Sequence, residues 1–130
     1  MSDFSKALSV TASGLRAQAA RLTHVSENIS NADTPGYRRK TVSFEAVRDL
    51  DSDVSQVEVG RIGLDRSELE NIYDPSHPLA DESGHYEGSN VDLMIELSDA
   101  REAQRTYEAN LKMFDQTRQM SASLMDLLRR

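Results

Sequence analysis

The fold is decided by one stretch near the N-terminus, where residues 26–37 read SENISNADTPGY. Asn31 is of a type that takes the left-handed conformation at helix ends, and Pro35 lacks the amide donor that a continuing helix needs. Pro35 and Gly36 fit the two central positions of a type II turn, whose second position requires a positive φ. The stretch therefore predicts that a helix ends by residue 32 and that Gly36 has a positive φ.

Upstream of this turn, residues 1–30 have the pattern of one long amphipathic helix. Apolar side chains recur every seven residues along one seam, and a second seam is interrupted by Thr11 and Gln18. At 1.5 Å per residue such a helix is about 40 Å long. The seam residues predicted for it are Phe4, Leu8, Leu15, Leu22, Val25 and Ile29.

A second helix is predicted at the other end of the chain. Ser89, followed three residues later by Asp92, has the form of a capping box, which starts the helix near residue 89. Apolar residues then follow at spacings of three and four, and past residue 119 they cover two sides of the helix. So wide an apolar surface needs more than one neighbour. The predicted seam residues are Leu93, Leu97, Tyr107, Leu111, Phe114, Leu124, Met125 and Leu128.

Between the helices the sequence predicts short extended segments and an acidic loop. Residues 41–44 form one extended segment, and the loose alternation of residues 54–64 predicts a small β-hairpin whose partner is residues 69–73. Prolines, glycines and acids over residues 74–88 predict a loop without regular structure.

The predicted fold is therefore mainly α, with two long terminal helices packing as a coiled-coil-like pair around a small insert of strands and loops. It forms one structural domain, made of an N-terminal helix (1–32), the insert (33–88) and a C-terminal helix (89–130).

Composition sets limits on this domain. The chain has 130 residues, 38% of them hydrophobic, with no tryptophan, which suits helical packing better than a thick core. It has no cysteine, which excludes disulfides and thiolate chemistry. No stretch approaches the roughly 20 apolar residues that span a bilayer, and the N-terminus lacks the layout of a cleavable signal peptide. From the residues alone, we predict a cytoplasmic protein without direct membrane insertion.

The net charge of −7 is unevenly distributed. Residues 1–40 carry six Lys/Arg and three acids, residues 41–92 carry three Arg and thirteen acids, and residues 93–130 carry six of each. So acidic a centre repels nucleic acid, and the short basic run 38–40 is too small to bind it. We predict a solvated acidic insert and no nucleic-acid partner.

Candidate chemistry is sparse. Glu82 and His85 have a spacing at which they, with Asp81, are able to bind a divalent metal, but nothing else converges on them. The acids between residues 49 and 53 lack the low-dielectric pocket that separates catalytic pKa values. We predict no catalytic residue, cofactor or metal. Two alternatives to a polymerising subunit stay open here: a coiled-coil adaptor of another assembly, and a metal-dependent enzyme that uses the loop histidines.

The opening stretch resembles the N-terminal signature of bacterial flagellar rod and hook proteins, roughly A-N-N-[IL]-A-N-x-x-T-P-G-[YF]. In this sequence Ser26, Glu27 and Ser30 replace the usual Ala, Asn and Ala. The matching positions are Asn28, Asn31, Thr34, Pro35, Gly36 and Tyr37.

Three further segments are similar to segments of the proximal rod subunits in this family. Residues 73–81 (YDPSHPLAD) match Y-D-P-x-H-P-x-A-D, residues 89–92 (SNVD) match P-N-V-[ND] except at Ser89, and residues 107–110 (YEAN) match Y-[EQ]-A-N. In the first of these, the family motif falls on Asp74, Pro75, His77 and Pro78.

The resemblance implies a structural subunit of the proximal rod, the drive shaft that crosses the periplasm, polymerising through its terminal helices to transmit torque. The implied partners are copies of itself, the other rod proteins and the flagellar type III export apparatus. That apparatus would export the chain without a cleaved signal, which replaces the cytoplasmic expectation with the periplasmic rod of the basal body.

Overall fold

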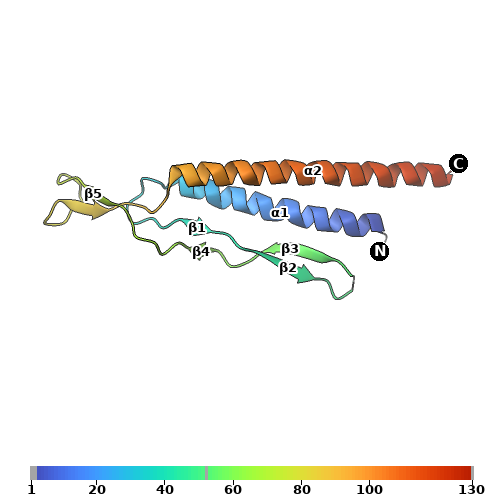
Figure 1. Ribbon diagram of the computed structural model, residues 1–130, viewed down its shortest axis with the longest axis horizontal. Coiled ribbons are helices and arrows are strands. Elements are labelled where there is room, and N and C mark those ends of the chain that lie inside the picture. Colours follow the sequence, from blue (N-terminus) through green and yellow to red (C-terminus); the bar gives the residue numbers. More distant parts are fainter. Residues whose placement is uncertain (1–2, 52, 130) are drawn as a thin grey trace.

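The structure is a computed structural model that describes residues 3–51 and 53–129. Two long helices, α1 (Asp3–Ser30) and α2 (Leu93–Arg129), lie side by side and antiparallel. The strands between residues 40 and 64 run along α1 on the side away from α2, so this part of the elongated molecule has three layers (Figure 1). The predicted fold class, a long helix pair around a small insert with strands, is confirmed.

The two helices differ in length. With 28 and 37 residues, they are roughly 42 and 55 Å long at 1.5 Å per residue. The C-terminal end of α2 therefore reaches past the start of α1, while the strands β5 (Asn71–Tyr73) and β6 (His85–Glu87) project from the opposite end of the molecule (Figure 1).

The strands form three separate antiparallel pairs. β1 (Lys40–Thr41) pairs with β4 (Gly63–Leu64), β2 (Phe44–Arg48) with β3 (Ser55–Val59), and β5 (Asn71–Tyr73) with β6 (His85–Glu87). Because each pair has only two strands, the insert depends on α1 for support.

The predicted hairpin partner is wrong. Residues 55–59 pair with residues 44–48, and within the predicted partner segment residues 71–73 pair instead with a strand inside the segment predicted to be an irregular loop. Alternation identifies a strand but not its partner. The short connection closed by the Asp49 amide and the Val54 carbonyl, 3.3 Å apart, makes the local pairing cheaper in loop entropy than the distant one.

The helix boundaries are close to those predicted, but two caps differ. Within the described residues no residue other than glycine has a positive φ, so Asn31 does not cap α1 in the left-handed conformation. Its side-chain amide instead donates to the Glu27 carbonyl at 2.9 Å. Asp92 caps α2, since its Oδ1 accepts from the Met94 amide at 3.0 Å, whereas the hydroxyl of Ser89 donates to the Ala32 carbonyl.

The buried core is small and mostly polar. In the described part of the chain, the buried apolar side chains are Ala17, Val25 and Ala103. Four polar or charged residues are buried with them: Ser13, Asn28, Ser89 and Glu96. Long apolar side chains are left on the surface, which is unusual for a chain that functions alone.

Candidate functional site

The predicted seam of α1 lies against the rest of the molecule. Val25 is buried, and the other five seam residues are half-buried: Phe4, Leu8, Leu15, Leu22 and Ile29. Ser13 on the same helix is buried and its hydroxyl accepts from the Val57 amide at 3.1 Å, so α1 also supports strand β3. Packing between α2 and the strands leaves α1 only partly available to other molecules.

Helix α2 meets α1 along a line of small and polar residues. Ala103 is fully buried, and Tyr107 and Phe114, four and eleven residues further on, are half-buried on the same face. A Cβ added to Gly14 would lie 3.0 Å from the side-chain nitrogen of Asn110, which shows how closely the two helices approach each other. Of the eight seam residues predicted on α2, Tyr107 and Phe114 are the two that are half-buried.

The other six predicted seam residues of α2 are exposed. Their exposed fractions run from 41% at Leu111 to 75% at Leu128. Leu111 lies about 80° around the helix from the buried Ala103, at 100° per residue. The six are Leu93, Leu97, Leu111, Leu124, Met125 and Leu128.

A second exposed apolar row runs along α2, and only its part past residue 119 was predicted, as an apolar surface on two sides of the helix. Met113, Met120 and Leu127 recur every seven residues and are 55–65% exposed. This row lies about 80° to 120° from Ala103 in the other sense, so the helix has an apolar flank on each side of its contact with α1. The signal was the same heptad spacing that identified the first seam.

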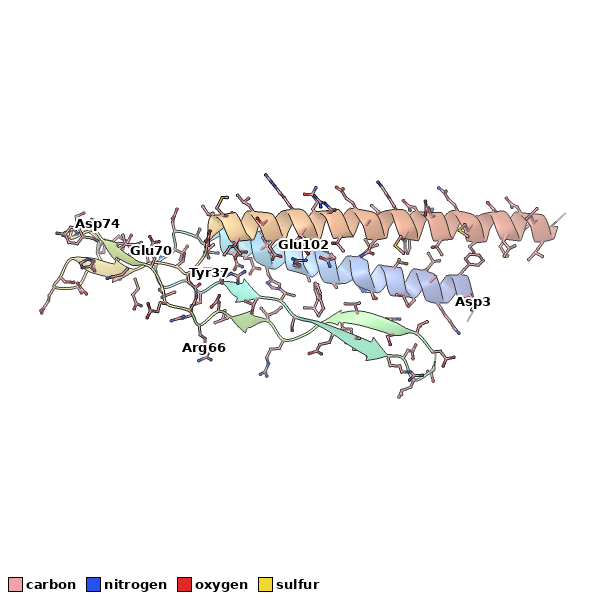
Figure 2. All side chains as sticks on the ribbon, viewed as in Figure 1. Asp3, Tyr37, Arg66, Glu70, Asp74 and Glu102 are labelled. Carbon is pink, nitrogen blue, oxygen red and sulfur yellow. The ribbon has the colours of Figure 1, made fainter. Side chains whose placement is uncertain are left out.

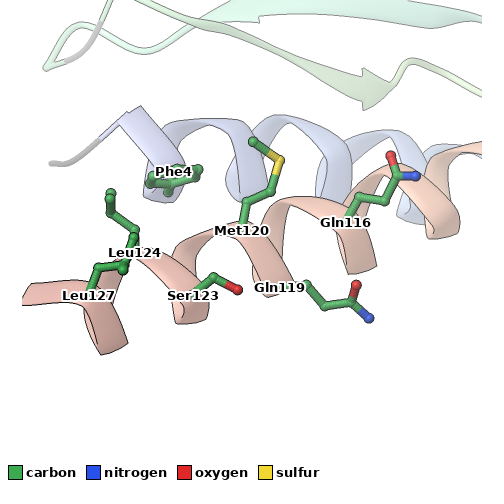
Figure 3. Close-up of a pocket in the computed structure, with 7 residues that line it drawn as sticks. All are labelled: Phe4, Gln116, Gln119, Met120, Ser123, Leu124 and Leu127. Atoms are coloured by element: carbon green, nitrogen blue, oxygen red, sulfur yellow. The ribbon is translucent and has the colours of Figure 1, made fainter.

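The second flank opens into a groove where α1 begins. Phe4 of α1 faces Met120, Leu124 and Leu127 of α2 across a hollow of about 620 Å³ (Figure 3). Beyond it α2 continues without α1, so the face that would otherwise meet α1 is uncovered at Met125 and Leu128.

At the opposite end of the helix pair, the family motif builds a polar junction. Asn28 is 1% exposed, and its side-chain oxygen accepts from the Lys40 amide and the Tyr37 hydroxyl, both at 2.8 Å. Its side-chain nitrogen donates to the Lys40 carbonyl at 3.0 Å and to Glu96 Oε2 at 3.3 Å. One asparagine therefore ties the end of α1, the turn, β1 and the start of α2 together.

Glu96 is the second centre of this junction. Its side chain is 0% exposed, and Oε1 accepts from Arg39 Nε at 2.6 Å. The Arg39 guanidinium also lies 3.5 Å from the Asp65 carboxylate, which follows strand β4 and compensates part of the positive charge of Arg39. A buried carboxylate is tolerated only with such partners.

The turn itself is held from two sides. Gly36 has φ 74° and the Tyr37 amide donates to the Thr34 carbonyl at 3.2 Å, which confirms the predicted turn. The Gly36 amide donates to carbonyls of residues 87 and 88, at 3.2 and 3.0 Å. The side-chain oxygen of Asn90 also holds the chain after the turn, since it accepts from the Arg39 amide at 2.7 Å.

Substitution of Gly36 tests this turn. Because nothing lies within 4 Å of an added Cβ, Gly36→Val should act through backbone strain alone and lower the free energy of unfolding by about 1–2 kcal/mol. Gly36→Asn is the matched control, since asparagine tolerates a positive φ and should cost less. Urea unfolding followed by circular dichroism measures both; equal stability of the two variants would exclude the strained turn.

The second motif organises the loop between β5 and β6. Asp74 Oδ1 accepts from the Ser76 amide at 3.2 Å, and His77 Nδ1 accepts from the Leu79 amide at 3.1 Å. The His77 ring stacks on Tyr86 with centroids 3.9 Å apart. Pro75 and Pro78 are exposed between these turns, and Figure 2 places Asp74 at the far end of the molecule from Asp3.

The candidate metal ligands are engaged in the same loop. Asp81 Oδ1 accepts from the Ser83 amide at 2.9 Å and from its hydroxyl at 2.6 Å, and His85 Nδ1 lies 3.0 Å from that hydroxyl. Over residues 3–51 and 53–129, no three His, Cys, Asp or Glu side chains gather as a metal site would require. In the same part of the chain, neither helix is both long and apolar enough to cross a membrane.

Three carboxylates are held ionised by their donors. The Lys40 ammonium, 2.5 Å from Glu27, lowers the pKa of Glu27 below its ordinary value of 4.5. The amide of Ser67 lowers the pKa of Asp65, and the hydroxyl of Ser83 lowers that of Asp81, below the ordinary 3.8. Because these pKa values are lower in the folded chain, the groups stabilise it above their unfolded pKa values and cease to do so as the pH falls.

Acid should therefore destabilise the chain. We expect the free energy of unfolding to be level from about pH 7 to 5 and to fall as the pH drops below about 4, through the lowered pKa values. Thermal unfolding followed by circular dichroism measures this, and Asp65→Asn should show a shallower fall. A stability that stays constant down to about pH 2 would contradict the assigned contacts.

Two family models match this chain. One, described as "Flagella basal body rod protein", matches residues 8–38, which hold most of α1 and the whole turn motif. The other, described as "Flagellar basal body rod FlgEFG protein C-terminal", matches residues 82–127, which hold β6 and nearly all of α2. Most of both helices, with Asn28, Tyr37 and Glu96 of the polar junction, thus falls within the matched segments.

Curated relatives match over almost the whole length. The flagellar basal-body rod protein FlgC of Agrobacterium fabrum is 46% identical, covering 99% of this chain and 98% of that protein. The protein of the same name from Aquifex aeolicus is 37% identical over 92% of this chain and 93% of its own length. That of Bacillus subtilis is 32% identical over 92% and 95%.

Proposed function

The chain belongs to the FlgC family of flagellar basal-body rod proteins and is a structural subunit of the rod, and we propose that it polymerises through its two terminal helices. The family supports assembly with copies of itself and with other rod proteins, and a place in the basal-body rod. How the subunits meet is the proposed part.

The observation that carries the proposal is the pair of apolar flanks on α2. One flank holds Leu93, Leu97 and Leu111, and the other holds Met113, Met120 and Leu127, with α1 packed between them. At about 25 cal/mol per Å² of apolar surface removed from water, covering such rows is the main favourable term that assembly has available. Two flanks on opposite sides fit a wall in which each subunit has a neighbour on each side.

We assign the subunit contacts to the residues of both helices that α1–α2 packing leaves wholly or partly uncovered. The contact on one side of a subunit must differ from that on the other, because the two flanks differ in sequence. Such a heterologous contact builds a helical polymer when the rotation between neighbours does not close into a ring. The residues predicted from the sequence are Phe4, Leu8, Leu15, Leu22, Val25, Ile29, Leu93, Leu97, Tyr107, Leu111, Phe114, Leu124, Met125 and Leu128, with Val25 supporting from within the subunit. The second flank adds Met113, Met120 and Leu127 to this set.

The finer features are proposals, which the family and the fold support. We propose that the polymer is the proximal, torque-transmitting part of the rod and that the type III apparatus exports the chain without cleaving a signal. We also propose that the three segments, 1–32, 33–88 and 89–130, act as one structural domain, since the polar junction joins all of them through Asn28, Arg39 and Glu96.

A coiled-coil adaptor of another assembly remains the runner-up and is less well supported. The heptads fit it, but relatives of the same name match both the helices and the insert over more than nine-tenths of the chain. An adaptor that bound its partners only through its helices would not need an insert similar in sequence to that of the rod proteins.

The test is the composition of isolated basal bodies. In cells whose own copy of the gene is deleted, the plasmid-borne chain should restore the rod and copurify with it, with an intact N-terminus by mass spectrometry. Recovery of the chain only in the cytosol, with rods assembled from the other proteins, would refute the assignment. A shortened N-terminus would refute the proposed export without cleavage.

A further inference from the structure

The seam of the helix pair does not by itself define how the helices are aligned. On α1 the seam residues Leu8, Leu15, Leu22 and Ile29 recur every seven residues, and on α2 the contact positions Glu96, Ala103 and Asn110 recur with the same period. A shift of one helix by seven residues therefore brings equivalent positions of the two helices together again. Small residues at the contact, such as Gly14 and Ala103, offer little further resistance to sliding.

In the structure, two contacts define the alignment of α1 against α2. Gly14 lies against Asn110, and fourteen residues further along α1, Asn28 bonds Glu96, which is fourteen residues back along α2. The second of these contacts is the chemically demanding one. Asn28 and Glu96 are 1% and 0% exposed, and after a shift of seven residues each would face an apolar or unmatched group while still buried.

We propose that the buried cluster of Asn28, Glu96 and Arg39 sets the register of α1 against α2. Buried polar groups often cost stability relative to apolar packing, and their best-attested use is the selection of one alignment among several. Here the Arg39 guanidinium, whose Nε lies 2.6 Å from Glu96 Oε1, neutralises the buried carboxylate. The side-chain amide of Asn28 donates to the second carboxylate oxygen, Glu96 Oε2, at 3.3 Å.

Other ion pairs between the same elements cannot do this as well. Arg21 of α1 pairs with Asp99 and Glu102 of α2, but these carboxylates are 28% and 73% exposed, so water would replace Arg21 after a shift. Glu27 and Lys40 are 37% and 35% exposed, and water would replace either partner after a shift. The full burial of Asn28 and Glu96 is what makes the Asn28–Glu96–Arg39 cluster selective.

The register of α1 against α2 matters for assembly because a neighbouring subunit would contact both helices at once. A slip of seven residues moves the α2 flanks by about 10 Å along α1, which separates Leu111 from the α1 surface that a neighbour also contacts. This consequence rests on the proposed function, whereas the register itself is a property of the single chain and is tested without assembly.

The test measures an inter-helix distance in the full chain. Since the chain has no cysteine, spin labels go only where Thr23→Cys and Asp115→Cys put them, at exposed positions on α1 and α2. Pulsed electron paramagnetic resonance on the otherwise unchanged chain should give one narrow distribution of the distance between the two labels. With Glu96→Met and Arg39→Met together, which keep side-chain volume but remove the charges, a second population displaced by up to about 10 Å should appear.

The control is Glu27→Met with Lys40→Met, which removes an equally short but half-exposed ion pair and should leave the distribution narrow. Glu96→Gln, which keeps a side-chain oxygen for Asn28, should give a smaller second population than the double Met variant. A single narrow distribution in the double Met variant would overturn the proposal. Loss of its helical circular dichroism would overturn it too, because the cluster would then supply stability and not alignment.

Discussion

Replacing Asn28 with leucine should unfold the junction between the two helices. The substitution leaves the Lys40 amide, the Lys40 carbonyl and the Tyr37 hydroxyl without their partner, in a site where Asn28 itself is 1% exposed. At roughly 1–3 kcal/mol for each buried group left unpaired, we expect a loss of about 3–5 kcal/mol in the free energy of unfolding. For a chain with so small a core, that is a large share of its stability.

Urea unfolding followed by far-UV circular dichroism measures this loss. Asn71→Leu is the matched control, because Asn71 is exposed on β5 and its replacement should change stability by less than about 0.5 kcal/mol. If Asn28→Leu were as stable as Asn71→Leu, the junction would not be the core of the chain, and the polar contacts assigned to it would carry little weight.

The second large effect concerns assembly. Leu111→Asp should leave the free subunit almost unchanged, since Leu111 is 41% exposed and the helix-propensity cost is about 0.5 kcal/mol. In a contact between subunits the same aspartate would be a charge buried among apolar groups, which costs several kcal/mol at each repeat of the polymer. We expect a normal level of soluble protein, basal bodies that stop short of a complete rod, and no swimming.

The matched control is Lys112→Asp, one residue further along the same helix. Lys112 lies about 180° from the buried Ala103, on the polar side of α2, so its replacement should leave swimming largely intact. Glu82→Gln in the distal loop should also be mild, whereas Leu15→Asp, at a half-buried position on α1, should weaken both subunit and polymer. Swimming by Leu111→Asp cells, with Lys112→Asp or Glu82→Gln cells immotile, would reverse the assignment of the packing surface.

The helices and the turn could be predicted because their signals are local. Heptad spacing along residues 4–29 and the Pro35-Gly36 pair act within a few residues, and the structure confirms both. The pairing of residues 44–48 with 55–59 could not be predicted from alternation alone, because a strand's periodicity does not name its partner.

The polar junction was hidden for a related reason. Asn28 was identified through its family motif, but its partner Glu96 lies 68 residues away and looks like an ordinary acid in the first turn of a helix. Only the folded chain shows that this acid is fully buried. The register of the helix pair is therefore a tertiary property that neither helix reveals by itself.

The most direct test of the account is a density map of isolated basal bodies at a resolution that traces side chains. It should show both flanks of α2 covered by neighbouring subunits, with Leu111 on one side and Met113 on the other out of contact with water, and Asn28 still bonded to Glu96 within each subunit. A rod in which these flanks face solvent, and the subunits touch only through the strands of the insert, would contradict assembly through the terminal helices.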